Sequence, residues 1–305
     1  MSLVTALALA AAAATDEVAL LPRPQLGYQF GREVFGILFE VPNVSGESRL
    51  EYPADVFLIG TALQLRWSRL MVGLTLQTNV GHPARLMTDR DWLTVDGVKE
   101  MWGNTHSRTE LREWLLDGGV GLRVLGQDAS VLYALAGLRV ESNDYRVLGA
   151  TGWLRRPDGS IDAGSLQGDF LISYQSRYVS PYVGARFESR IYGPLAIALE
   201  ARLLHGFSSH DDDHRMRGKR LHADVRAFAW LGAIEAAVDV AQKPGELRFG
   251  LRSEIVSSSG VGVLHQQFYA DDPGAKGDQT GLAFDDTFTI SYLRVRTTAF
   301  AETSF

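Results

Sequence analysis

Two short acidic stretches hold side chains of this sequence that could carry out general acid–base chemistry. In SSHDDDHRMRGKR, residues 208–220, Asp212 and His214 stand two positions apart, and in TDRDW the same spacing separates Asp89 from Asp91. Because an extended backbone projects every second side chain to one side, the members of each pair would share a face. Carboxylates beside an imidazole can activate water, and either stretch alone also fits a solvated loop end or a loose divalent-cation site.

Long β-strands are the elements that must position these pairs. The alternation of unlike faces with a period of two is clearest in four segments, residues 59–67, 70–77, 195–203 and 247–255. In the last of these, Leu251 lies on one face while Arg252 and Glu254 lie on the other. Such mid-strand charges recur in segments longer than the usual ~5–6 residues of a globular strand. Lipid on the outer face and a polar interior account for both features, as in a transmembrane β-barrel.

Short and long connections alternate along the chain. Short ones are expected at Ser68 and at residues 126–129, 192–194 and 242–245. Long polar ones are expected at residues 41–48, 81–108, 142–168, 207–220 and 257–285. These turns and loops separate ten strands, so the sequence predicts an all-β fold, a ten-stranded antiparallel transmembrane β-barrel with long extracellular loops. The terminal Phe305 resembles the assembly signal of bacterial outer-membrane barrels.

The amino-terminal segment reads as a secretory signal peptide. An apolar run from Leu3 to Ala14 is followed at once by polar residues, and it is too short to span a membrane as a helix. The alternative is an alanine-rich soluble helix. We therefore expect a signal peptide at residues 1–14 and a single transmembrane β-barrel domain at residues 15–305.

Composition excludes several classes of function. The net charge of the 305-residue chain is -6 and its basic residues are dispersed, so nucleic acid is not an expected partner. The sequence has no cysteine, which removes disulfides, thiol chemistry and cysteine-based zinc sites from consideration. No metal or organic cofactor is expected, and the expected oligomeric state is a monomer.

The two acidic pairs fall at the openings of the second and fourth long loops. In a ten-stranded barrel these positions lie on opposing walls, so the pairs could face each other across the mouth. With these motifs the chain resembles the omptin family, the outer-membrane proteases with an Asp-Asp pair facing an Asp-His pair. The matching motifs are Asp89-Arg90-Asp91-Trp92, Ser208-Ser209, Asp212-x-His214, Gly218-Lys219-Arg220, Ser48-x-Leu50-Glu51-Tyr52, Tyr174 and Pro181-Tyr182-Val183-Gly184. The resemblance covers nearly all of the expected mature chain.

The resemblance implies an aspartic-type endopeptidase that forms no covalent intermediate. Asp212 would fix the tautomer of His214, which would act as general base on a water molecule. Asp89 and Asp91 would hold that water from the opposite side, and two close carboxylates can share a proton. These four residues are the expected catalytic site.

The resemblance also implies a substrate site, a lipid contact and a location. Glu33 and His210 are expected to bind substrate, with a preference for basic residues, although His210 and Asn104 stand at positions that are often acidic in the family. Arg177 is expected to contact lipopolysaccharide. The expected partners are therefore peptide or protein substrates, lipopolysaccharide and outer-membrane lipid. The expected location is the Gram-negative outer membrane, with the site on the extracellular side.

Two other functions fit the same architecture. The first is a non-catalytic barrel that acts as an adhesin or surface-binding protein, with a vestigial acidic rim. The second is a small pore. Peptide cleavage separates the endopeptidase from the first, and ion conductance in planar bilayers separates it from the second.

Overall fold

The computed structural model describes residues 18–41, 44–81, 85–127, 129–156, 158–240, 247–271 and 277–303. Its strands are β1 (Ala19–Val41), β2 (Val44–Pro53), β3 (Val56–Trp67), β4 (Leu70–Val80), β5 (Arg85–Val95), β6 (Val98–Gln127), β7 (Ser130–Arg155), β8 (Ile161–Tyr192), β9 (Leu195–His214), β10 (Lys219–Asp239), β11 (Leu247–Phe268) and β12 (Ala283–Thr303). A 3-10 turn, η1 (Arg215–Arg217), follows β9. The expected signal peptide, the short turn at residues 242–245 and Phe305 lie outside the described residues.

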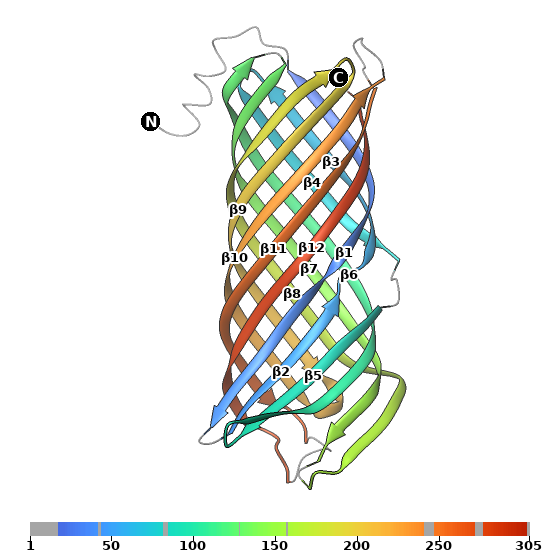
Figure 1. The fold of residues 1–305 in the computed structure, drawn as a ribbon, viewed down its shortest axis with the longest axis vertical. Coiled ribbons are helices and arrows are strands. Elements are labelled where there is room, and N and C mark those ends of the chain that lie inside the picture. The colour runs from blue at the N-terminus through green and yellow to red at the C-terminus, as the bar shows by residue number, and fades with distance from the viewer. Residues whose placement is uncertain are drawn as a thin grey trace.

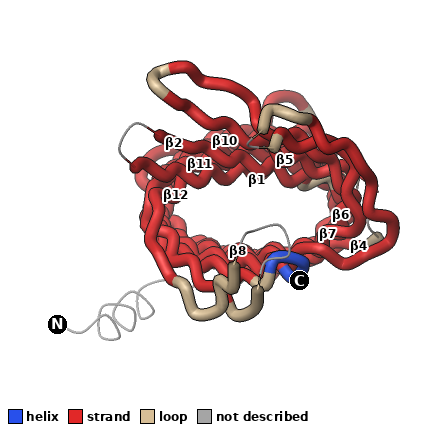
Figure 2. Tube along the Cα trace, turned by 90° about the horizontal axis from the view of Figure 1, so that it is seen from below, coloured by secondary structure: helices blue, strands red, loops and turns tan. Residues whose placement is uncertain are grey.

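The strands form one closed antiparallel barrel. The first strand, β1, pairs with β12, and it also pairs with β2 and β3, which follow each other along the same wall. In the same way β4 and β5 both pair with β6. The strands β2 and β3 therefore count as one strand of the wall, and so do β4 and β5, which gives a ring of ten strands. Figures 1 and 2 show the closed ring from the side and along its axis. The predicted fold class is confirmed.

An apolar belt covers the outer face of the barrel. In β9 the outward side chains from Leu195 to Phe207 are apolar except His205, and the next outward positions are Ser209 and the exposed Asp211. In β10 the same change occurs between the exposed Phe228 and Arg226. We take the belt as the membrane-spanning part, and the polar ends of the strands beyond it as the part outside the membrane. Among the described residues, no helix is long and apolar enough to cross a membrane.

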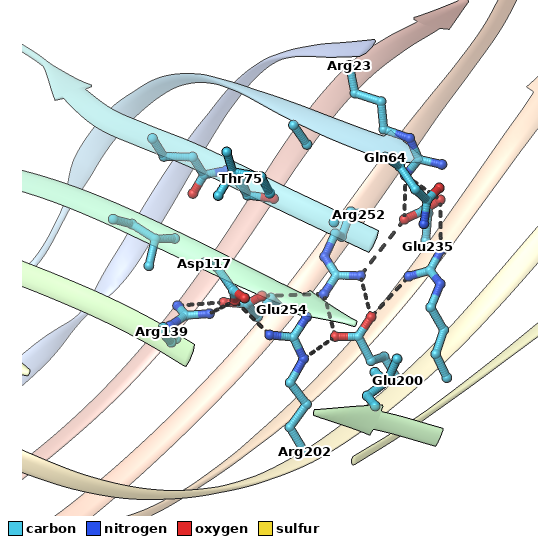
Figure 3. A pocket seen from close by; sticks show the side chains of 18 of the residues that line it. Arg23, Gln64, Thr75, Asp117, Arg139, Glu200, Arg202, Glu235, Arg252 and Glu254 are labelled. Carbon is cyan, nitrogen blue, oxygen red and sulfur yellow. Dashed lines mark hydrogen bonds and ion pairs between the residues drawn. The ribbon is translucent and has the colours of Figure 1, made fainter. Parts of the chain in front are cut away.

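The interior at the level of the belt is filled by arginines and acidic residues. Arg139 contacts Asp117, Glu141 and Glu254 at 3.4, 2.6 and 2.8 Å. The remaining members of this ion-pair network include Arg23, Arg186, Glu200, Arg202, Glu235 and Arg252 (Figure 3). Buried charges are tolerated when each has a close partner. The network leaves a cavity of about 130 Å³ among these side chains.

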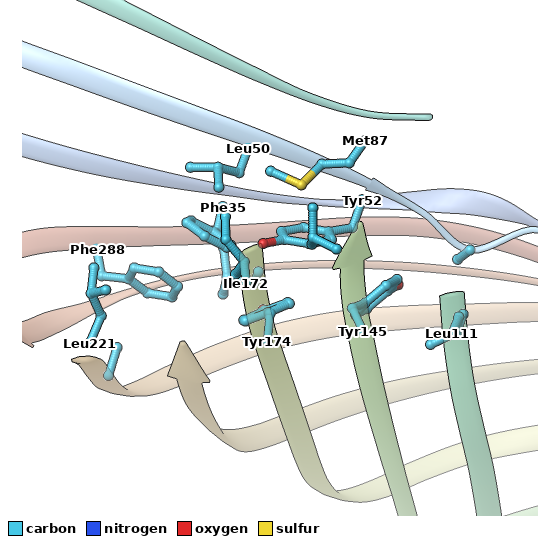
Figure 4. Close-up of a cluster of buried hydrophobic side chains, with 14 of the residues drawn as sticks. Phe35, Leu50, Tyr52, Met87, Leu111, Tyr145, Ile172, Tyr174, Leu221 and Phe288 are labelled. Atoms are coloured by element: carbon cyan, nitrogen blue, oxygen red, sulfur yellow. The ribbon is translucent and has the colours of Figure 1, made fainter. Parts of the chain in front are cut away.

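Toward the end of the barrel that carries β2 and β5, drawn at the bottom of Figure 1, the interior becomes apolar and aromatic. We call this end the mouth and treat it as the upper end of the barrel. Phe35, Tyr52, Tyr145 and Tyr174 come from four different strands and are all at most 1% exposed (Figure 4). The ring of Tyr52 lies 4.7 Å from that of Tyr174 and 4.8 Å from that of Tyr145. We call this cluster and its buried neighbours the aromatic plug. It closes the barrel directly below the mouth.

Several segments that we predicted as long loops continue as strands. Residues 81–108 contain β5 and the start of β6, joined by a two-residue turn at Asp96 and Gly97 with φ of 49° and 80°. Much of residues 142–168 and 207–220 is also strand. Outside the lipid both faces of a strand can be polar, so these ends lack the apolar alternation by which the strands of the belt were found.

Candidate active site

The Asp212–His214 pair lies at the end of β9. His214 is the last residue of the strand, and its Nε2 atom lies 3.1 Å from Oδ2 of Asp212. The neighbouring strands on both sides of β9 hold the pair in place. Asp212 is opposite Tyr174 of β8, and His214 is opposite Lys219 of β10. Gly218 reverses the chain after η1 with a left-handed φ of 56°. The pair expected from the spacing is thus formed as a hydrogen-bonded unit.

The Asp89–Asp91 pair lies on β5, between β2 and β6. Asp89 is opposite Leu50 and Asp91 is opposite Ser48. The hydroxyl of Ser48 lies 3.5 Å from Oδ1 of Asp89, and it comes from a motif to which the sequence assigned no role. On the other side Gly103 is opposite Asp91, and a Cβ atom at Gly103 would come within 3.0 Å of Oδ2 of Asp91. The glycine leaves the space that this carboxylate occupies.

Electrostatics link the two pairs across the mouth. Burial, together with the negative charges of Asp91 and Asp212, raises the pKa of Asp89 to about 8. The positive charge of Arg217, in η1, and the Ser48 hydroxyl act in the opposite direction. A carboxyl with this pKa keeps its proton at neutral pH. Asp91 and Asp212 therefore lie near enough to Asp89 for their charges to act on its carboxyl, and His214 is joined to Asp212 by its hydrogen bond. We call the space between the two pairs the cleft.

Two buried polar atoms at this cleft have no hydrogen-bond partner among the described residues. One is Oδ1 of Asp212, whose residue is 6% exposed. The other is the hydroxyl of Tyr52, in the aromatic plug. Burial and the nearby charges of Asp212 and Asp89 raise the pKa of Tyr52 well above its usual value. The tyrosine hydroxyl therefore remains a neutral donor, and an unpaired buried acceptor such as Oδ1 of Asp212 is suited to bind water or a substrate donor.

The residues expected to bind substrate form the floor of the cleft. Glu33 is 0% exposed and His210 is 2% exposed. They are joined by Tyr174, whose hydroxyl donates to Oε1 of Glu33 at 2.7 Å and lies 2.8 Å from Nδ1 of His210. Asn104, the other residue at a position that is often acidic in the resembled family, is opposite Arg90 in the β5–β6 register. Neither Glu33 nor His210 presents its polar atoms at the surface of the cleft.

Arg177 lies on the opposite, outer face of the barrel. It is an exposed side chain of β8, two residues before Val179 and nearer the mouth. Val179 is apolar and 43% exposed. It therefore stands at the upper edge of the apolar belt. In the described ranges, no group of three or more His, Asp and Glu side chains is placed to hold a metal ion.

Comparison with known proteins shows what the barrel is similar to. No protein-family model and no curated sequence matches the chain. Among solved structures, the outer membrane protease OmpT from Escherichia coli matches with a TM-score of 0.80 and 17% identity, over 94% of this chain and 97% of that chain. This chain has the fold of OmpT. The OmpT match spans nearly all of both chains.

Other barrels are less similar. The translocator domain of the autotransporter NalP from Neisseria meningitidis matches with a TM-score of 0.33 and 11% identity, over 96% of this chain and 92% of that chain. A Pseudomonas aeruginosa FadL homologue matches with a TM-score of 0.28 and 10% identity, over 94% and 90%. Neither superposition is close enough to add to the OmpT comparison.

Proposed function

We propose that this protein is an outer-membrane endopeptidase whose site consists of Asp89, Asp91, Asp212 and His214. The observation that carries the proposal is the hydrogen-bonded Asp212–His214 pair, together with the facing Asp89, whose pKa the Asp212 charge helps to raise. A carboxylate–imidazole pair opposite a carboxyl pair is suited to activate a water molecule held between them. The fold shared with a known outer membrane protease supports the same reaction class.

The hydrogen-bond geometry supports a role for each group. Because Nε2 of His214 donates to Asp212, the Nδ1 atom of the neutral ring is free to accept a proton from water. Asp89 and Asp91 would hold the same water from the opposite wall, with one proton kept on Asp89. The water oxygen attacks the peptide carbonyl carbon, the C–N bond breaks, and the proton held by His214 passes to the leaving amine. Asp212 stabilises the imidazolium formed between these steps.

The test compares peptide cleavage by the parent with cleavage by Asp212→Asn and His214→Ala. The matched control is the outer-wall pair Asp211 and His222, which lie 2.8 Å apart and face away from the cleft. Loss of a general base should lower kcat/KM by about 10²–10⁴-fold. Asp211→Asn and His222→Ala should cleave like the parent. Equal turnover in the parent and both site variants would refute the proposed site.

Lipopolysaccharide is the lipid partner that we propose for the outer face. The support is the position of Arg177, an exposed cation at the edge of the apolar belt, where lipid phosphates would lie. The measurement is cleavage by refolded protein with and without lipopolysaccharide, for the parent and Arg177→Ala. A loss of the lipid-dependent increase in Arg177→Ala alone would support the contact, and identical curves would exclude it.

A further inference from the structure

A small cavity lies beside Asp212, among residues of the aromatic plug. Its lining is apolar except at two positions, and it consists of Phe35, Ile37, Tyr174, His210, Asp212, Leu221, Leu264 and Phe288. The volume is about 10 Å³, which is the room that one water molecule or one methyl-sized group needs. A side chain seated over this floor next to Asp212 therefore meets a shallow, mostly apolar surface.

The one carboxylate beneath this floor is fully occupied. Oε1 of Glu33 accepts hydrogen bonds from Tyr174 at 2.7 Å and from Tyr178 at 2.8 Å. Oε2 accepts from Arg294 at 2.8 Å and from Asn143 at 3.3 Å. Because Arg294 is itself 1% exposed, its charge compensates that of Glu33 inside the protein. Glu33 therefore has no charge or lone pair left for a cationic substrate side chain.

The other polar group of the floor, His210, is neutral. Since the Tyr174 hydroxyl donates to Glu33, its oxygen accepts from Nδ1–H of His210 at 2.8 Å. The Nε2 atom then accepts from the hydroxyl of Ser208 at 2.9 Å. Burial lowers the pKa of His210 to about 3, so the ring stays neutral over the physiological range. Both ring nitrogens are occupied, and the ring adds no negative charge to the floor.

We infer that, if the protein is the proposed endopeptidase, it selects substrates with a small uncharged residue next to Asp212. This residue, glycine, alanine or serine, would lie over the floor that contains His210 and covers the Glu33–Arg294 pair. Lysine or arginine would bury a cation without a free carboxylate partner below it. Oδ1 of Asp212 is a buried carboxylate oxygen without a hydrogen-bond partner among the described residues, and the space of about 10 Å³ beside it has the size of a methyl or hydroxyl group. This preference is the opposite of the basic preference that the sequence resemblance implies.

The experiment uses refolded full-length protein and a peptide library in which one position carries Ala, Ser, Phe, Lys or Arg. We expect kcat/KM for peptides cleaved next to Ala or Ser to exceed that for Lys or Arg by at least about tenfold. His210→Asp should raise the ratio of Arg to Ala cleavage at least about tenfold, since it places a carboxylate in the floor. The matched neutral variant His210→Asn should keep the parent ratio.

Failure of the preference and failure of the proposed function give different results. Cleavage that prefers Lys, Arg or Phe and is lost in His214→Ala would overturn the preference and leave the endopeptidase intact. If the parent cleaves nothing, the endopeptidase fails, and the floor is tested by equilibrium binding of alanine- and arginine-containing peptides to the parent. Tighter binding of the arginine peptide would overturn the inference, and tighter binding of the alanine peptide would support it.

Discussion

At the scale of single residues, the proton on Asp89 is the most informative feature of the cleft. Burial and the charges of Asp91 and Asp212 together raise the pKa of Asp89 to about 8. In an unfolded chain the same carboxyl would ionise near pH ~3.9. Folding thus takes up a proton between these two pH values. The family resemblance implied that Asp89 and Asp91 could share a proton, but not that the charge of Asp212 would help to keep it there.

This proton makes the stability of the barrel depend on pH. A carboxyl whose pKa is raised by folding stabilises the protein most below the unfolded pKa, and this stabilisation is lost as pH rises from about 4 to about 8. Asp89→Asn removes the cost of ionisation, so its melting temperature should exceed that of the parent by more at pH 9 than at pH 4. Thermal unfolding in detergent measures the difference. Asp211→Asn, on the outer wall, is the control, and an equal effect of Asp89→Asn at both pH values would contradict the assignment.

At the scale of elements, neighbouring strands fit one another through small residues as well as through hydrogen bonds. Gly119 of β6 and Gly137 of β7 are opposite each other, and Gly137 is opposite Tyr182 of β8. A Cβ atom at Gly137 would lie 2.4 Å from the Tyr182 hydroxyl oxygen and from the carbonyl oxygen of Gly118. The Tyr182 ring therefore occupies the space over two glycines. The positions of Gly119 and Gly137 in the sequence do not indicate which aromatic side chain the two glycines accommodate.

Gly137→Ala should consequently destabilise the barrel. Overpacking of this kind costs about 1–3 kcal/mol, because the added methyl group meets backbone as well as the Tyr182 ring. Gly73→Ala is the matched control, since a Cβ atom at Gly73 has no atom within 4 Å. Melting temperatures of the two variants in the same detergent check the prediction. Equal melting temperatures would show that β8 can move away from β6 and β7.

The elements also mark where prediction from sequence succeeds and where it stops. Mid-strand charges such as Arg252 and Glu254 indicated a polar interior, because one lipid-facing side leaves only the lumen for them. The same alternation is missing in residues 81–108, where water surrounds both faces, and the hairpin there was predicted as a loop. The partners of a residue across the barrel could not be predicted. The contact of Arg139 with Glu254 at 2.8 Å, for instance, joins β7 to β11, which are not neighbours in the wall.

At the scale of the whole molecule, the lumen is closed twice. The ion-pair network fills it at the level of the belt, and the aromatic plug closes it below the mouth (Figures 3 and 4). Paired charges at one level of the lumen and buried aromatic rings at the next argue against a water-filled channel through it. The structure of the described residues therefore favours an enzyme or a binding protein over the small pore that the sequence alone allowed.

Planar-bilayer recordings test this directly. The parent protein should show no stepwise conductance, because charges such as Arg139 and Glu141 are held by each other at 2.6 Å and are not free to guide ions. A porin reconstituted in the same bilayer confirms that insertion can be detected. Reproducible steps from the parent at moderate voltage would restore the pore as a candidate.

The distribution of the four site residues over the ring has a consequence for biogenesis. Asp89 and Asp91 belong to the wall strand made of β4 and β5, whereas Asp212 and His214 belong to β9, more than a hundred residues later in the chain. The halves meet only when the intervening strands have curved into a cylinder. For the proposed endopeptidase, a chain still on its way to the membrane would therefore lack an assembled site, and insertion itself would bring the two pairs together.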